Sequence, residues 1–297
     1  MIHNLLQQYL PEVEAKLQQI LVLPESSLQP VLKILQDALN YSMFPGGKRI
    51  RALLMILIYQ LFDAKGWKKI VPSACAVELV HLSSLLLDDL PSMDNATLRR
   101  GKEVCHRKYG ENVAVLAAVG LLNLAYQVIF IENQPYFSEK KIHQISQELS
   151  HAVGFSGMIG GQFIDLKQDL QNLNLEQMEY IHSHKTSSLF IGCMRISALL
   201  AGAKNQELEA ITKYGKNLGL AYQIKDDLLD LKATPEQMGK DANQDIHKFT
   251  FVKLCGPEKA FELMQRLTES SIQAISFFGK KADLLVELSR FLVCRTH

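Results

Sequence analysis

The stretch from Leu85 to Gly101 reads Leu-Leu-Leu-Asp-Asp-Leu-Pro-Ser-Met-Asp-Asn-Ala-Thr-Leu-Arg-Arg-Gly, and the rest of the chain is organised around it. An apolar helical run ends there in two adjacent carboxylates, Asp88 and Asp89. Because Pro91 disfavours helical backbone at the residue before it, the helix is expected to end or kink at Leu90. Two acids at a loosened helix end can lean toward a common point.

Clustered carboxylates need opposite charge nearby. Asp94 follows, and then Arg99 and Arg100. At about 4 Å and an effective dielectric near 20, two like unit charges repel by roughly 4 kcal/mol. Mg²⁺ removes this repulsion, and it is typically bound by one or two carboxylates with water and phosphate oxygens. Arginine binds phosphate bidentately. The stretch therefore predicts a Mg²⁺–diphosphate site; the alternative is a solvated acidic helix end beside an unrelated basic loop.

A second acidic cluster closes another apolar helix. Asp226 and Asp230 are i and i+4, so they share a helix face, and Asp227 lies beside them. Alone, this could be an exposed acidic face. Lys240 and Lys248 follow it, however, as the arginines follow the first cluster. If the clusters face each other, they can hold several Mg²⁺ ions and one diphosphate between them.

A basic segment fits a second anion. Gly46 and Gly47 precede Lys48 and Arg49 at the start of a predicted helix, followed by Arg51, so backbone, side chains and helix dipole could all favour phosphate. The segment lacks the spacing of a Walker loop. His81 lies two turns before Asp88 on roughly the same face. Such a histidine is either a ligand of this anion or a satisfied core residue.

Composition excludes several classes. The 297 residues are 47% hydrophobic with a formal net charge of +1, so the chain is neither disordered nor a polycation, and nucleic-acid binding has no compositional support. The five cysteines are scattered and lack CxxC spacing, which argues against zinc or a disulfide framework and for a reducing, cytoplasmic environment. No secretion signal is visible at the N-terminus.

Apolar residues recur with helical spacing, and no alternating strand is convincing. We predict one all-α domain spanning 1–297, an antiparallel helical bundle, with helices over about 5–20, 28–39, 50–62, 72–90, 113–131, 138–153, 174–201 and 205–231 and one or two more from Pro257 onward. The segment Val113–Ile131 is uncharged and long enough to span a membrane. We favour a helix buried in a bundle or dimer interface over stable membrane insertion, since polar residues interrupt it and no basic flank adjoins it.

With these pieces assembled, the chain resembles the trans-isoprenyl diphosphate synthases of the short-chain bacterial and plastid type, such as farnesyl and geranylgeranyl diphosphate synthases. The resemblance runs from about Asn40 to Thr250. Five blocks occur in the family's order: Gly46-Gly47-Lys48-Arg49-x-Arg51, Asp88-Asp89-x4-Asp94 with Leu98-Arg99-Arg100-Gly101, Gly161-Gln162-x2-Asp165, Lys185-Thr186, and Tyr222-Gln223 before Asp226-Asp227-x2-Asp230.

The resemblance implies a helical bundle around a central apolar cavity, usually as a homodimer, with three Mg²⁺ ions per site. It implies metal binding by Asp88, Asp89, Asp94, Asp226, Asp227 and Asp230, and allylic diphosphate binding by Arg99, Lys185, Lys240 and Lys248. Isopentenyl diphosphate would be bound by Gly47, Lys48, Arg51, His81 and Arg100. Thr186 and Gln223 would turn their dipoles toward the allylic cation, beside the catalytic Lys185, Asp88 and Asp226.

The implied reaction is ionisation of an allylic diphosphate, attack by isopentenyl diphosphate and proton loss. Ser83, five residues before Asp88, is small where farnesyl-type relatives often carry an aromatic floor, which favours a C20 over a C15 product. Ala118-Val119, Ser187 and the segment after Lys248 depart from the family pattern. The alternatives are a non-catalytic regulatory subunit, which should have lost one aspartate cluster, and another terpenoid synthase (a cyclase or head-to-head coupler), which needs no second-diphosphate site.

Overall fold

The computed structural model describes residues 2–24, 27–44, 47–167, 175–231 and 250–294. Its long helices are α1 (Ile2–Ile20), α2 (Gln29–Met43), α3 (Ile50–Gln60), α4 (Val71–Asp88), α6 (Glu111–Ile131), α7 (Glu139–Val153), α8 (Met158–Lys167), α9 (Leu175–His182), α10 (Ser188–Ala201), α11 (Asn205–Asp230), α14 (Pro257–Ala274) and α15 (Asp283–Cys294). Shorter pieces are η1 (Trp67–Ile70), α5 (Cys105–Tyr109), η3 (Ser183–Ser187), α13 (Phe251–Cys255) and η4 (Ser276–Ala282).

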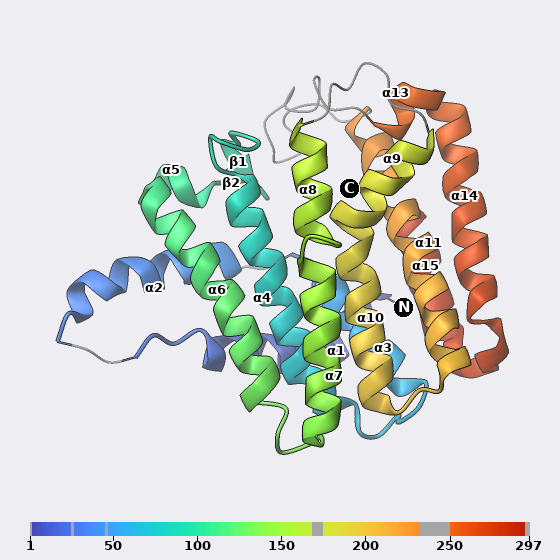
Figure 1. Cartoon of the computed structure of the whole chain (residues 1–297), viewed down its shortest axis with the longest axis horizontal. Coiled ribbons are helices and arrows are strands. Elements are labelled where there is room, and N and C mark those ends of the chain that lie inside the picture. The colour runs from blue at the N-terminus through green and yellow to red at the C-terminus, as the bar shows by residue number, and fades with distance from the viewer. Residues whose placement is uncertain (1, 25–26, 45–46, 168–174, 232–249, 295–297) are drawn as a thin grey trace.

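The helices form a bundle whose core lies around α3, α4 and α10. Nearly every residue of α3 is buried, which is why its sequence is apolar on all sides. Helix α4 packs mainly against α6, and α10 packs against α3, α7 and α11. Figure 1 shows α4 and α11 ending at the same end of the bundle, beside α8 and α9. The all-α prediction is confirmed.

One predicted helix is divided in the structure, whereas the first helix, for which the sequence allows one helix or a pair around Pro11, is continuous through that proline. The long helix predicted over 174–201 is instead α9 and α10, separated by a π-helical turn, η3. Asn174, which the sequence pairs with Gln177 as a capping box for the helix predicted over 174–201, lies outside the described residues. Ser138, which the sequence offers as the cap of the helix predicted over 138–153, is the N-cap residue of α7, although its side chain makes no capping hydrogen bond.

The sequence pattern missed two elements. Helix α8 was not predicted, because glycines within and before it weaken the helical signal. The two-residue strands β1 (Leu98–Arg99) and β2 (Lys102–Glu103) pair antiparallel and form a small hairpin. Arg100 and Gly101 make its turn at φ 54° and 74°. The hairpin is too short to produce an alternating pattern in the sequence.

Helix α6 is the uncharged helix predicted to be buried, and the structure buries only one of its faces. Its inner face packs on α4, whereas Leu116 and Val119 are 63% and 58% exposed. By length and composition, the segments Trp67–Asp88 and Glu111–Ile131 could each cross a membrane; the most apolar window of the first is 78% buried and that of the second 39%. The first is therefore a core helix, and the second presents an apolar face outward.

Candidate active site

The first aspartate cluster lies where α4 ends and the chain folds back. Helix α4 ends at Asp88, two residues earlier than predicted. The backbone N–H of Asp94 donates to the carbonyl of Asp88 at 2.9 Å, and that of Ala96 donates to the carbonyl of Asp89 at 3.1 Å. These bonds close the loop onto the helix end. Asp94 therefore returns to Asp88, as a shared site requires.

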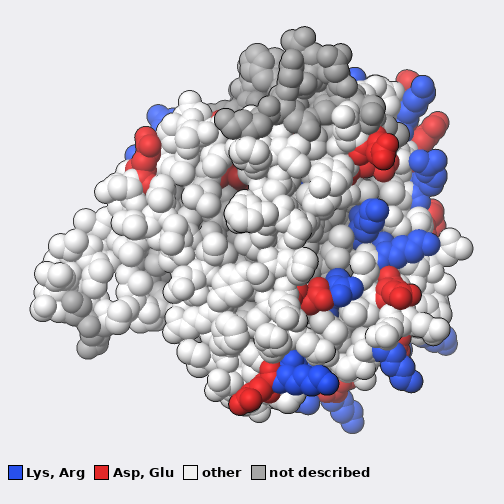
Figure 2. Space-filling view, viewed as in Figure 1, with Lys and Arg blue, Asp and Glu red and all other residues white. Residues whose placement is uncertain are grey.

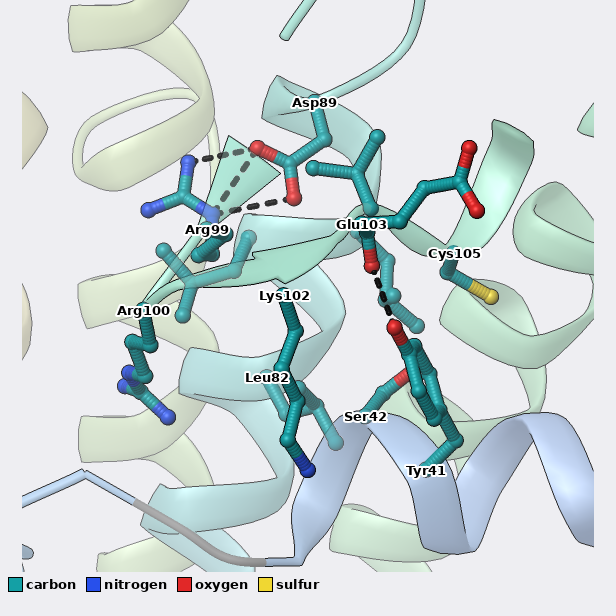
Figure 3. A pocket seen from close by; sticks show the side chains of 12 residues that line it. Tyr41, Ser42, Leu82, Asp89, Arg99, Arg100, Lys102, Glu103 and Cys105 are labelled. Carbon is teal, nitrogen blue, oxygen red and sulfur yellow. Dashed lines mark hydrogen bonds and ion pairs between the residues drawn. The ribbon is translucent and has the colours of Figure 1, made fainter. Parts of the chain in front are cut away.

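Asp89 and Arg99 pair with each other. The Nε of Arg99 donates to both carboxylate oxygens of Asp89, at 2.8 and 2.9 Å, and its Nη2 donates to Oδ1 at 2.6 Å. Figure 3 shows Arg99 turned toward Asp89, whereas Arg100, the next residue, points away. Burial opposes the charge of Arg99, but the bond to Asp89 and the charges of Asp89, Asp88 and Asp94 hold its pKa above the ordinary value.

A cavity of about 150 Å³ lies behind this ion pair, between α2, α4 and the hairpin. Arg99, Arg100 and Lys102 contribute cationic groups to its lining, and Leu82, Leu85 and Leu86 contribute apolar ones (Figure 3). The hydroxyl of Tyr41 donates to the carbonyl of Glu103 at 2.8 Å and ties α2 to the hairpin. Through this contact α2 supports the strand pair that carries both arginines.

Helix α8 and the π-helical turn join the first aspartate cluster to the second. The side-chain amide of Gln162 donates to Asp88 Oδ1 at 3.0 Å. One turn further along α8, Asp165 accepts a 2.5 Å hydrogen bond from the ammonium group of Lys185. Thr186, next in the turn, donates to Gln223 Oε1 at 3.0 Å. A continuous set of elements therefore leads from α4 through α8 and η3 to α11.

The second cluster contains one carboxylate held entirely by protein donors. Gln223 donates through Nε2 to Asp227 Oδ1 at 3.0 Å, and the backbone N–H of Phe251 donates to Asp227 Oδ2 at 3.0 Å. Asp227 is buried, at 6% exposure, whereas Asp226 and Asp230 are half-buried. The first cluster likewise contains one buried carboxylate, Asp89, which is 3% exposed, and two half-buried ones, Asp88 and Asp94.

The π-helical turn touches α8 so closely that a side chain on Gly161 has no room. A Cβ added there would lie 2.2 Å from the backbone nitrogen of Lys185. Helical turns with i→i+5 hydrogen bonding are rare and occur frequently at functional sites. Here Lys185 of the turn contacts Asp165 of α8, and Thr186 contacts Gln223 of α11.

The residues predicted to bind a second anion also gather. The guanidinium of Arg100 lies against Gly47, since a Cβ there would be 2.7 Å from Arg100 Nη2. The guanidinium of Arg51 lies 4.6 Å from the centre of the Phe190 ring. Burial, Arg51 and Arg100 together hold the pKa of His81 well below its ordinary value. A neutral histidine among arginines gives a pocket with a strong positive field, which suits a phosphate.

The structure thus brings together most of the predicted residues. Lys48 is exposed on the loop before α3. Gly46, Lys240 and Lys248 lie outside the described residues. Of the family departures, Ala118 is buried against α4, and Val119 lies on the exposed face of α6. Ser187 is fully buried against Gly219 of α11, where its hydroxyl has no hydrogen-bond partner in the part of the chain that the structure describes.

Comparison with known proteins identifies the group to which the chain belongs. The model of the family described as polyprenyl synthetase matches residues 32–275. The chain belongs to the polyprenyl synthetase family. It is 40% identical over 266 residues to a dimethylallyltranstransferase of Fischerella ambigua, a match that covers 89% of this chain and 76% of the relative. It is 39% identical over 274 residues to the chloroplastic geranylgeranyl pyrophosphate synthase 9 of Arabidopsis thaliana, covering 90% of this chain and 76% of the relative.

A solved structure of a polyprenyl synthetase relative agrees. The geranyltransferase of Helicobacter pylori, complexed with magnesium and isoprenyl diphosphate, superposes with a TM-score of 0.82 and 29% identity, covering 97% of this chain and 96% of that chain. The comparisons confirm the predicted family and the predicted reaction class, short-chain prenyl transfer.

Some functional contacts of this polyprenyl synthetase were not predicted. Gln162 and Asp165 were noted as part of a sequence block, and their contacts with Asp88 and Lys185 now give them a role. The backbone N–H of Phe251, which binds Asp227, could not have been found from a side-chain pattern. Gly161 was the one feature of the sequence that could have pointed to these contacts of α8, since a glycine there permits the close approach of the Lys185 backbone.

Proposed function

We propose that this chain joins isopentenyl diphosphate to allylic diphosphates, using the two aspartate clusters as its ionising site. The proposal rests on hydrogen bonds that link the two clusters through α8 and η3. Gln162 of α8 donates to Asp88, and Lys185 of η3 donates to Asp165 of α8. Thr186 donates to Gln223, which in turn donates to Asp227. Both clusters are whole, which favours an enzyme over a non-catalytic subunit.

The half-buried carboxylates suit Mg²⁺. Asp88, Asp94, Asp226 and Asp230 offer the hard oxygen donors that Mg²⁺ prefers. Among the described residues, no group of three or more acidic, histidine or cysteine side chains is close enough to hold an ion by itself. This arrangement suits ions that bridge protein and substrate, since Mg²⁺ is usually bound by one or two carboxylates plus phosphate oxygens. We propose that three ions bind with the allylic diphosphate.

Asp89 and Asp227 then support the site without binding the metal directly. Each has both carboxylate oxygens in hydrogen bonds with protein donors. We therefore assign them to holding Arg99 and Gln223 in place, and assign direct metal binding first to the four half-buried carboxylates. Lys240 and Lys248 remain proposed ligands of the allylic diphosphate, outside the described residues.

The chemistry follows from the charges. Mg²⁺, when bound, neutralises the diphosphate as it leaves. Arg99 and Lys185 add fixed positive charge beside the same leaving group. As the allylic C–O bond breaks, Thr186 and Gln223 present dipoles to the cation. The double bond of isopentenyl diphosphate attacks that cation, a C–C bond forms, and a proton passes to the departing diphosphate. No protein nucleophile is required.

The second diphosphate binds in the pocket of Gly47, Lys48, Arg51, His81 and Arg100. Its presence favours chain elongation over a cyclase or head-to-head coupler, neither of which needs a second such site. Because His81 is neutral, it can serve as a hydrogen-bond donor whose protonation state does not vary near pH 7. Lys48→Ala is expected to cripple elongation.

Product length depends on the space beneath Asp88. Ser83 is buried, and its hydroxyl donates to the carbonyl of Ala118 at 2.8 Å, so it faces α6. Ser84 lies between His81 and Asp88 on the same face of α4, about 6 Å below Asp88 at 1.5 Å per residue. We propose a C20 product in preference to C15, because both positions are small, and Ser84 is the one beneath the site.

We further propose that the enzyme works as a homodimer in the cytoplasm. Exposed apolar side chains lie on α6 (Val115, Leu116, Val119) and along α8 and the turn before it (Phe155, Ile159, Phe163, Leu166). Figure 2 shows this face of the molecule as largely uncharged at its centre and left, with charges along the right edge and lower rim. All five cysteines are free thiols, which fits a reducing compartment.

The test is product analysis by mass spectrometry. The purified protein is incubated with isopentenyl diphosphate, Mg²⁺ and each allylic primer in turn, and the prenyl alcohols are analysed after dephosphorylation. We expect geranylgeraniol as the main product and none without Mg²⁺. Ser84→Phe should shift the products to shorter chains, whereas Ser84→Ala should not. Absence of any elongated product would contradict the proposed function; farnesol alone would contradict only the product length.

A further inference from the structure

A buried ion-pair cluster lies between α1, α4 and the loop that precedes α3. Its residues are not among the proposed ligands of either diphosphate. Arg49 is at its centre, with a side chain 4% exposed. Its Nε donates to Glu14 Oε1 at 2.8 Å, its Nη1 to Glu78 Oε2 at 3.4 Å and its Nη2 to the carbonyl of Met43 at 2.9 Å. The Glu78 side chain is likewise 4% exposed, whereas that of Glu14 is 31% exposed.

The backbone of Arg49 needs this support. Arg49 is the N-cap residue of α3 and has left-handed backbone at φ 46° and ψ 39°, a conformation that residues with a side chain rarely adopt. Strained backbone of this kind persists only where the surroundings fix it. Three contacts from three separate segments fix it here.

Glu78 also fixes the first turn of α3 directly. Its Oε1 accepts a hydrogen bond from the backbone N–H of Ala52 at 3.3 Å. That N–H is among the first four of the helix, which have no partner within the helix itself. One carboxylate oxygen of Glu78 therefore holds Arg49, and the other holds the start of α3 against α4.

The cluster lies among residues proposed to bind isopentenyl diphosphate. Lys48 and Arg51 flank Arg49 and Ile50 in sequence, and His81 follows Glu78 by one turn of α4. The Nε of Arg51 is buried and has no hydrogen-bond partner among the described residues. Burial opposes the charge of Arg49, but the hydrogen bond to Glu14 and the charges of Glu78 and Glu14 hold its pKa above the ordinary value. Arg49 is thus a charged group already matched by carboxylates.

We infer that Arg49 and Glu78 are positioning residues of the isopentenyl diphosphate site, because their ion pair sets α3 on α4, with Lys48 just before the start of α3 and Arg51 close enough to His81 to lower its pKa. This inference rests on the proposed function. In this inference Arg49, the first arginine of the Gly-Gly-Lys-Arg-x-Arg block, does not contact the substrate. It acts by holding its neighbours in place.

The test separates the two substrates kinetically in the full-length enzyme. Arg49→Met is expected to raise the KM for isopentenyl diphosphate by about tenfold or more, as loss of a supporting hydrogen bond does at other sites. The KM for geranyl diphosphate should stay within about twofold, since no contact of Arg99 or Lys185 changes. Arg195→Met is the matched control: Arg195 forms an ion pair with Glu148 that joins α7 to α10. It should lower the thermal midpoint and leave both KM values unchanged.

A double variant distinguishes positioning from stability. Arg49→Met with Glu78→Gln leaves no buried charge unpaired and keeps an oxygen for the N–H of Ala52, so part of the lost stability should return. The KM for isopentenyl diphosphate should remain high. If it returns to the wild-type value, or if Arg49→Met raises both KM values equally, the inference is overturned.

Three further outcomes are decisive. Should Arg49→Met fail to fold, Glu78→Gln takes its place, because it removes the Arg49–Glu78 ion pair while Arg49 keeps Glu14 as a partner and the N–H of Ala52 keeps an oxygen acceptor. It should raise only the KM for isopentenyl diphosphate, and an unchanged KM would overturn the inference. A wild-type protein that forms no elongated product would overturn the proposed function itself. An active wild-type enzyme with an unaffected Arg49→Met variant overturns this inference alone.

Discussion

Neighbouring carboxylates in each aspartate cluster are in different environments. In the first cluster Asp89 is buried and paired with Arg99, while Asp88 is half-buried and accepts from Gln162. In the second cluster Asp227 is buried between Gln223 and the backbone of Phe251. The family resemblance implied six metal ligands, because adjacent acids in a sequence look equivalent. The protein donors that hold Asp89 and Asp227 are the basis of our proposal that only the other four bind metal directly.

This division can be tested by comparing Asp88→Asn with Asp89→Asn. We expect Asp88→Asn to raise the Mg²⁺ concentration for half-maximal activity by about tenfold or more, because a direct ligand is lost. Asp89→Asn should change this concentration by less than about threefold but raise the KM for geranyl diphosphate, since Arg99 loses its charged partner. The two variants carry the same substitution at adjacent residues, so each is the control for the other. Equal effects on the Mg²⁺ requirement would refute the division.

His81 supplies a prediction about pH. Burial and the surrounding arginines lower its pKa in the folded protein, so between that pKa and the unfolded value of about 6.5 the unfolded chain binds the extra proton. Folding stability linked to His81 is therefore lost as pH falls below about 6.5. Denaturant unfolding at pH 7.5 and 5.0 should show a larger loss of stability for the wild type than for His81→Gln. Identical losses would show that His81 does not titrate in this way.

At the scale of elements, the π-helical turn is the feature that sequence patterns could not supply. Helical spacing runs through residues 175–201 without interruption by proline, and it predicted one continuous helix. Within the turn, Lys185 contacts Asp165 on α8 and Thr186 contacts Gln223 on α11. Those partners come from distant parts of the chain. By contrast, the helices around α3, α4 and α11 were predictable because their apolar spacing records burial directly.

Gly161→Ala tests the close approach of α8 to this turn. A Cβ at residue 161 would lie 2.2 Å from the Lys185 nitrogen, so the turn must move. Overpacking of this kind costs about 1–3 kcal/mol, and we expect a lower thermal midpoint and a sharp loss of kcat. Gly120→Ala on α6 is the matched control, since nothing lies within 4 Å of its Cβ position. It should be neutral or stabilising by up to about 1 kcal/mol. Unchanged kcat in Gly161→Ala would argue against the contact.

At the scale of the whole molecule, α6 has an apolar face that the single chain does not bury. Its uncharged sequence predicted burial on all sides, and the structure buries only the face toward α4. The apolar side chains that stay exposed on α6 and α8 are the part of this surface that the single chain does not bury. They support our proposal that a second copy completes the burial, which no periodicity in one chain can show.

The dimer is tested by Leu116→Glu combined with Val119→Glu. Two charges on the outer face of α6 should prevent association, because unpaired charges within an interface are strongly disfavoured. Light scattering should give about 67 kDa for the wild type, twice the 33.5 kDa of one chain, and about half of that for the variant. Phe261→Glu on α14 is the control, since Phe261 is also exposed, at 47%, and lies on another helix. A monomeric wild type would rule the dimer out.

The central claim is that both aspartate clusters bind one metal-bound diphosphate together. Calorimetric titration with inorganic diphosphate, with and without Mg²⁺, tests it most directly in the wild type, Asp88→Asn, Asp226→Asn and the exposed control Glu262→Gln. The account predicts Mg²⁺-dependent binding in the wild type and in Glu262→Gln, and a loss of at least about tenfold in affinity in each aspartate variant. Binding that survives either aspartate substitution unchanged, or that needs no Mg²⁺, would contradict it.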